Sequence, residues 1–101
     1  MLKVGPEAET VTNEQGGKQS KVEYRVDLMP PLATLQIAQV LKHGADKYGE
    51  NNWHAISVKE HLNHMLIHTI AYLAGDKQDD HLGHMACRAM MALEIELRGK
   101  H

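Results

Sequence analysis

A helix that carries histidines on one face constrains the fold of this chain more than any other feature of its sequence. His61, His64 and His68 recur at spacings of three and four residues. At about 100° per helical residue, the three side chains lie within roughly one sixth of a helix circumference. Tyr72 continues the same stripe, and the remainder of this segment is almost wholly apolar. The pattern predicts a helix with one polar stripe.

A second polar stripe follows after a short link. His81, His84 and Arg88 are also spaced by three and four residues, so they share one face of a further helix. A link through residues 75–78 is short enough to make the two helices antiparallel neighbours. The two stripes would then face each other, as in sites that are built inside helical hairpins.

Helix boundaries can be placed from capping signals. Ser57 with Glu60 three residues later is a capping box, so we expect a helix from residue 58 to about residue 74, with Gly75 as its stop. Asp79 or Asp80 can cap the last helix, which continues to about residue 98.

An earlier helix opens at Pro30 and Pro31, because proline is tolerated in the first turn. Its sequence is apolar on most sides, which predicts a central core helix, and Gly44 interrupts it. Together with the later helices, this predicts an all-α fold, a compact domain of three to four helices over residues 21–101. Residues 1–20 are polar and form an N-terminal arm, extended or folded as a loose hairpin.

Length and composition limit the function classes. With 101 residues the chain is one domain that buries only about two thirds of its unfolded surface, so we expect a homo-oligomer. The formal charge of −2 argues against non-specific binding of duplex nucleic acid. The single cysteine, Cys87, fits a buried thiol. We expect neither a signal peptide nor a membrane span, and a cytoplasmic location.

Two loops carry groups that suit a nucleotide. Tyr48 and Trp53, beside Lys47 and Asn52, could stack on a flat ring and bind it through hydrogen bonds. Alternatively, Trp53 only fills the space between helix ends. Near the N-terminus, Gly16 and Gly17 precede the cations Lys18 and Arg25, which could bind phosphate, although a flexible basic linker explains the same residues.

Three interpretations of the histidines and nearby aspartates compete. In the first, the cluster binds a divalent metal through residues drawn from His64, His68, Asp76, Asp80, His81 and His84. In the second, His64, His68, His84 and Arg88 form a cationic pocket that binds phosphates without metal. In the third, the histidines are only hydrogen-bonded polar core. The spacing matches no single named catalytic motif.

The order of these segments resembles a known family. The runs RVDLMPP (25–31), GADKYGENNW (44–53), the histidine helix and GDKQDDHLGHMA (75–86) resemble the small phage domain known as the N-terminal domain of dATP/dGTP diphosphohydrolase. The resemblance covers roughly residues 16 to 95, nearly the whole chain. It implies a compact helical fold and a purine deoxynucleotide ligand.

The resemblance also implies roles for individual residues. Those expected at the nucleotide are Arg25, Lys47, Tyr48, Asn52 and Trp53. Those expected at the phosphates or metal are His68, Asp76, Asp80, His81 and His84.

Two main hypotheses follow. The first is a diphosphohydrolase that converts purine deoxynucleoside triphosphates to monophosphates and pyrophosphate with Mn²⁺, Mg²⁺ or Zn²⁺, in which His68, Asp80 and His84 are catalytic and Lys18, His64 and Arg88 help to bind substrate. The second is a phage protein that sequesters a nucleotide or cyclic-nucleotide signal without cleaving it. A third, weaker possibility is a structural subunit whose histidines only stabilise the helices.

Overall fold

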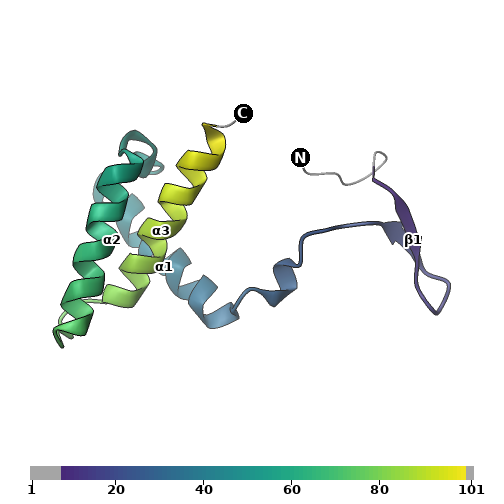
Figure 1. The fold of residues 1–101 in the computed structure, drawn as a ribbon, viewed down its shortest axis with the longest axis horizontal. Coiled ribbons are helices and arrows are strands. Elements are labelled where there is room, and N and C mark those ends of the chain that lie inside the picture. Colours follow the sequence, from purple (N-terminus) through teal and green to yellow (C-terminus); the bar gives the residue numbers. More distant parts are fainter. Residues whose placement is uncertain (1–7, 100–101) are drawn as a thin grey trace.

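The computed structural model describes residues 8–99 and shows a helical protein with a two-stranded N-terminal hairpin (Figure 1). The three helices are α1 (Pro31–Tyr48), α2 (Val58–Leu73) and α3 (His81–Arg98). The strands are β1 (Thr10–Thr12) and β2 (Lys18–Ser20), and two short 3-10 turns are η2 (Val26–Leu28) and η3 (Asn52–Ala55). The predicted all-α fold class is confirmed.

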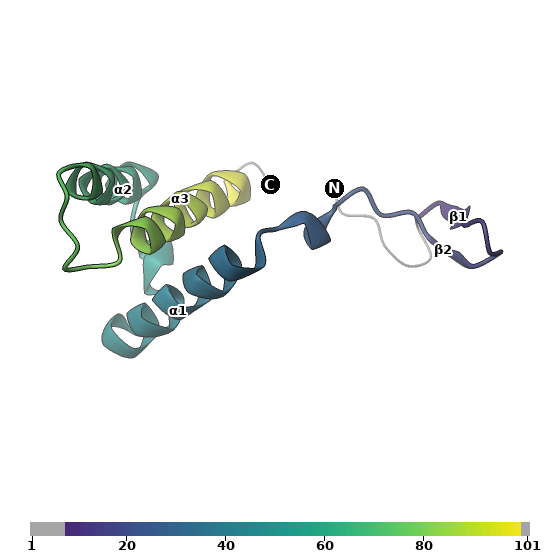
Figure 2. The same cartoon turned by 90° about the horizontal axis from the view of Figure 1, so that it is seen from below.

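The N-terminal arm folds as a hairpin and lies apart from the helices. β1 and β2 are antiparallel, with Val11 opposite Gln19. The Asn13 side chain accepts hydrogen bonds from the backbone N–H groups of Gln15 and Gly17, which closes the turn. The hairpin extends beyond the N-terminal end of α1, away from the helices (Figures 1 and 2). Residues 1–7 of the predicted arm lie outside the described residues.

Side-chain caps fix the starts of α2 and α3, as the sequence predicted. Ser57 Oγ accepts a hydrogen bond from Glu60 N at 3.2 Å. Asp80 Oδ1 accepts one from Gly83 N at 3.0 Å, so Asp80 is the cap of α3. Each cap satisfies a backbone N–H that has no partner within the helix. The caps therefore fix the residues at which α2 and α3 begin.

The helices form an antiparallel α2–α3 pair with α1 packed against α3 on one side (Figure 2). The most buried side chains lie between α2 and α3 and along α3. Cys87 is 2% exposed, as predicted for a structural thiol, and burial raises the pKa of that thiol. His61 is fully buried. No helix in the described range is long and apolar enough to cross a bilayer.

Helix α1 differs from its prediction in two respects. It continues through Gly44 to Tyr48 and ends where Gly49 adopts a φ of 96°. The packing of α1 against α3 offsets the low helix propensity of Gly44. It is also not a central core helix, because none of its residues is buried. Only one side of α1 has a neighbouring helix, so its apolar side chains on the other side remain exposed.

Asp80 also ties α1 to α3, because its Oδ2 accepts a hydrogen bond from Gln36 Nε2 at 2.6 Å. We therefore expect Asp80→Ala to lower the free energy of unfolding by about 2 kcal/mol, roughly half from the lost cap and half from the lost bond to Gln36. Urea unfolding followed by circular dichroism would measure this change.

The matched control for this prediction is Asp46→Ala, which removes an exposed aspartate that pairs with Lys42 on the surface of α1. We expect this variant to unfold like the parent, because exposed ion pairs contribute little. Equal stabilities of the Asp80 and Asp46 variants would show that the cap and the bond to Gln36 do not hold α3 against α1.

Candidate functional site

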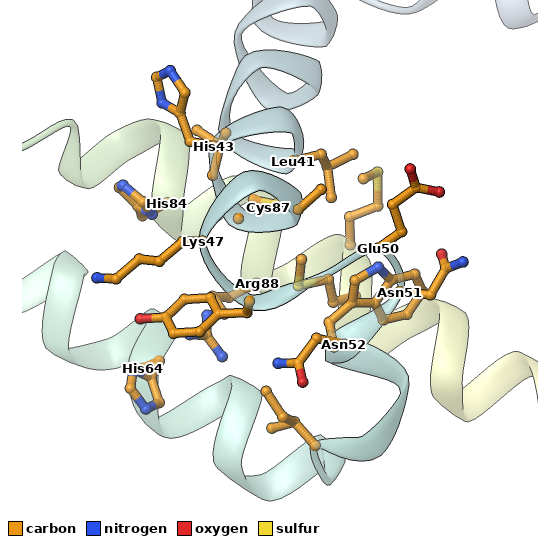
Figure 3. Close-up of a pocket in the computed structure, with 18 of the residues that line it drawn as sticks. Leu41, His43, Lys47, Glu50, Asn51, Asn52, His64, His84, Cys87 and Arg88 are labelled. Atoms are coloured by element: carbon orange, nitrogen blue, oxygen red, sulfur yellow. The ribbon is translucent and has the colours of Figure 1, made fainter.

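A pocket of about 890 Å³ opens between α1, α2 and α3 (Figure 3). This volume is in the range of small-molecule sites. The predicted site residues that line it are Lys47, Tyr48, Asn52, Trp53, His64, His68, His84 and Arg88. The structure thus brings together residues from four separate segments of the sequence. The predicted residues Lys18, Arg25, Asp76, Asp80 and His81 do not line it.

One end of the pocket is aromatic. Tyr48 ends α1 and is largely exposed, with Lys47 Nζ 5.1 Å from the centre of its ring. Trp53 is half-buried in η3, and the Arg98 guanidinium lies 5.8 Å from its ring centre. Gly49 and Asn51 both have positive φ angles, which lets the chain turn sharply between the two aromatics. This end can accept a flat ring.

A buried histidine connects the aromatic end to the cationic wall. Arg88 Nη1 lies 3.1 Å from His61 Nδ1, and His61 Nε2 lies 3.0 Å from the Trp53 carbonyl oxygen. Because arginine can only donate, His61 Nδ1 accepts and its Nε2–H donates to the carbonyl. His61 therefore holds both Arg88 and Trp53. Sequence reasoning placed His61 on the polar stripe but gave it no role at the site.

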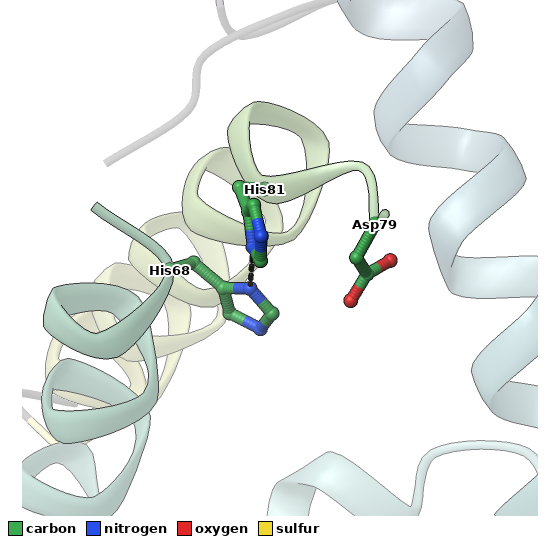
Figure 4. A group of neighbouring side chains, drawn as sticks. All are labelled: His68, Asp79 and His81. Atoms are coloured by element: carbon green, nitrogen blue, oxygen red, sulfur yellow. Dashed lines mark hydrogen bonds between the residues drawn. The ribbon is translucent and has the colours of Figure 1, made fainter. Parts of the chain in front are cut away.

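Three histidines and two aspartates form a cluster beside this pocket, and Figure 4 shows His68, Asp79 and His81 among them. His68 Nδ1 and His81 Nδ1 are 2.9 Å apart, and His81 Nε2 lies 2.5 Å from Asp76 Oδ2. His84 stacks on His68 with ring centres 4.9 Å apart, and its Nε2 lies 3.5 Å from Asp79 Oδ1. The two predicted stripes thus meet across the α2–α3 pair.

The electrostatic environment favours an uncharged His68. Burial lowers the pKa of this imidazole, and the neighbouring His84 lowers it further. The hydrogen bond from His81 lowers the pKa of Asp76, which therefore stays ionised. A neutral imidazole beside an ionised carboxylate is the state in which these groups bind a metal.

Three groups of the cluster could hold a metal ion together. Ligand atoms of His68, Asp79 and His81 all lie within 4.8 Å of one another. Two imidazoles and one carboxylate suit transition metals such as Mn²⁺ and Zn²⁺ better than Mg²⁺. Asp76 lies behind His81, in the position of a carboxylate that orients a metal-bound histidine. The donor set therefore fits the divalent metal that the sequence suggested.

Asp79 and Asp80 occupy different positions, although they are adjacent in the sequence. Asp79 lines the pocket beside His84, whereas both carboxylate oxygens of Asp80 accept hydrogen bonds, from Gly83 and Gln36. A direct catalytic or metal-binding role of Asp80 stays a prediction. Sequence reasoning placed Asp79 near the histidines and named it as a possible helix cap but gave it no role at the site, because spacing does not reveal which of two adjacent carboxylates faces a pocket.

The chain matches a known protein family over most of its length. The family model described as dATP/dGTP diphosphohydrolase, N-terminal, matches residues 13–101. No curated protein and no solved structure matches.

The buried position of His61 leads to a stability prediction. We expect His61→Ala to lower the free energy of unfolding by about 2–4 kcal/mol, because it leaves a cavity and removes both hydrogen bonds of the ring. Chemical unfolding monitored by Trp53 fluorescence would measure the loss. The control His43→Ala changes an exposed histidine of α1. If both variants were equally stable, His61 would not be the connection between Arg88 and Trp53.

The lowered pKa of His68 predicts a pH dependence of stability. Its folded pKa lies below the unfolded value of about 6.5, so the unfolded chain binds the proton first as the pH falls. The contribution of His68 is thus fully present above the unfolded pKa and declines as the pH falls toward the folded pKa. We expect the parent to lose more stability than His68→Gln between about pH 7.5 and 5.5, measured by urea unfolding with a metal chelator.

The exposed control His43→Gln should follow the parent over this pH interval. If His68→Gln also lost as much stability as the parent, the imidazole of His68 would not be held uncharged by its surroundings.

Proposed function

The chain belongs to the dATP/dGTP diphosphohydrolase N-terminal family, and from this premise we propose that it cleaves purine deoxynucleoside triphosphates to monophosphates and pyrophosphate. The proposed setting is phage-type nucleotide metabolism in the cytoplasm of the host. The observation that carries the proposal is the pocket, which combines an aromatic end with a cationic and histidine-rich wall.

The pocket offers each part of a nucleotide a suitable partner. In the proposed complex, the purine stacks near Tyr48 and Trp53, and Asn52 is available for hydrogen bonds to the base edge. The triphosphate extends toward Lys47 and Arg88, whose charges offset its negative charge. The hydrogen bond between Arg88 and His61 orients the guanidinium before substrate binds. Such preorganisation stabilises developing charge without reorganisation during the reaction.

The proposed reaction is displacement at the α-phosphorus. A water oxygen forms a new bond to this phosphorus, and the bond from the phosphorus to the oxygen that bridges to the β-phosphate breaks. Pyrophosphate leaves with the bonding electron pair, while a histidine accepts the proton of the water. His84 is suited to this role, because it lines the pocket and its Nε2 lies near Asp79. His68 then serves as a metal ligand.

The proposed metal site consists of His68, Asp79 and His81, with Asp76 orienting His81. When bound, the ion would supply Lewis-acid polarisation of the phosphoryl oxygens. Asp80 supports the site indirectly by starting α3, the helix that carries His81 and His84.

A binding protein without catalysis is the second candidate, and one observation favours it. Lys47, His64, His84 and Arg88 surround the pocket and could bind phosphates without any metal. Such a protein would sequester a purine nucleotide or a cyclic-nucleotide signal. It would bind its ligand independently of metal and release it unchanged.

We also propose that the chain is a homo-oligomer, which its surface area supports. Its accessible surface is 8295 Å², compared with about 5,700 Å² for a folded monomer of 11.3 kDa. The radius of gyration of 18.0 Å also exceeds the value of about 13 Å for 100 compact residues. The projecting arm and the exposed faces of the helices both contribute to these differences.

The hydrolase proposal is tested by incubating the protein with dGTP or dATP, with and without Mn²⁺, and identifying products by mass spectrometry. We expect monophosphate and pyrophosphate only with metal. Asp79→Asn should lower turnover by about 100-fold, because it removes a ligand charge beside the reacting phosphate. The matched control Asp46→Asn, on the exposed surface of α1, should retain turnover.

Two other results would contradict the hydrolase proposal. Binding of either nucleotide with all ligand recovered intact, both in the presence and in the absence of Mn²⁺, would establish the sequestering protein instead. Full turnover by Asp79→Asn would remove the cluster at His68 from the mechanism.

A further inference from the structure

The α2–α3 pair has an apolar face that no other described part of the chain covers. On α2, large apolar side chains are spaced by four, four and three residues, and they are between 40% and 75% exposed. They are Leu62, Leu66, Ile70 and Leu73. At about 100° per residue, these four positions span about a quarter of the helix circumference. Regular spacing over three turns indicates a packing seam rather than scattered surface leucines.

Helix α3 has a matching stripe. Leu82, Leu93 and Leu97 are between 43% and 58% exposed. Ala86 and Ala89 lie between them on the same side of the helix, so the stripe also covers about a quarter of the circumference. Small residues between large ones leave room for side chains of a facing helix.

The two stripes lie on the same side of the helix pair. His64 and His68 of α2 share the pocket with His84 and Arg88 of α3, so these residues mark the side toward α1. On each helical wheel the centre of the apolar stripe lies roughly 140° or more away from these pocket residues. Both stripes therefore face away from α1, which packs on only one side of the pair (Figure 2).

These seven large side chains form one surface, which we call the outer leucine face: Leu62, Leu66, Ile70, Leu73, Leu82, Leu93 and Leu97. We propose that it binds the outer leucine face of a second copy of this chain. Two antiparallel pairs joined in this way form a four-helix bundle related by a two-fold axis. The inference rests on the oligomeric part of the proposed function and specifies which surface joins the subunits.

The size of the outer leucine face favours a second copy as its occupant. A stable interface removes about 800 Å² from each partner. Seven large apolar side chains that are between 40% and 75% exposed present a surface of this order on each subunit. A surface made of two helices with apolar stripes is also complementary to itself, as a two-fold interface requires.

The proposed dimer leaves both nucleotide pockets open. Each pocket lies between α1 and the opposite side of the helix pair, so the two pockets face away from each other. No residue of the outer leucine face is among the pocket residues. Dimer formation can therefore be tested without nucleotide, and its failure is distinguishable from failure of the hydrolase proposal.

The test is the mass of the full chain in solution, measured by light scattering after gel filtration. We expect the parent to show twice its chain mass of 11.3 kDa. The double variant Leu66→Glu with Ile70→Glu should weaken dimerisation by more than about 100-fold, because it would bury two unpaired carboxylates in each subunit. The matched control Leu32→Glu with Leu35→Glu places two charges on exposed leucines of α1 and should remain dimeric.

A parent protein that stays at its chain mass up to about 200 µM would overturn the inference. The inference would also be overturned if the Leu66 and Ile70 double variant remained dimeric. Dissociation of the Leu32 and Leu35 control would overturn it too, because the interface would then lie elsewhere. If the Leu66 and Ile70 double variant fails to fold, the melting temperature of the parent tests dimerisation instead. The melting temperature of a dimer rises with protein concentration, and a constant value would exclude a dimer.

Discussion

The antiparallel packing of α2 on α3 is the interaction on which the rest of the structure depends. Polar contacts cross between the two helices at three levels: His61 with Arg88, His68 with His81, and Thr69 with the sulfur of Met85. A buried polar group is costly unless it is paired, so each contact fixes the register of one helix against the other. The pocket wall, the metal-binding geometry and the outer leucine face all follow from this register.

Much of this pairing could be predicted from the sequence. Spacings of three and four place histidines on one side of a helix whatever surrounds it, and the short link after Gly75 brings the two stripes together. The caps at Ser57 and Asp80 were predictable for a similar reason, because capping depends only on residues within one turn. Tyr48 and Trp53 line the same pocket, as their closeness in the sequence suggested.

Other features depend on what lies next to a segment in space, which periodicity does not reveal. The apolar sequence of α1 predicted a core helix, yet it has a neighbour on one side only. Asp79 and Asp80 are chemically equal, but the start of α3 turns one toward the pocket and the other toward Gln36. His61 has the same spacing as its neighbours on the stripe, and only tertiary packing makes it the fully buried one.

The contact between His68 and His81 has a consequence for calorimetry. Two Nδ1 atoms at 2.9 Å need one ring hydrogen between them. A metal ion bound to both nitrogens would take the place of this hydrogen, and Nε2 of a neutral His68 can accept it by a change of tautomer. Metal uptake would then release no proton from these two rings, and the measured heat of binding would not vary with the ionisation enthalpy of the buffer. A heat that does vary would show that a proton leaves the site when the metal binds.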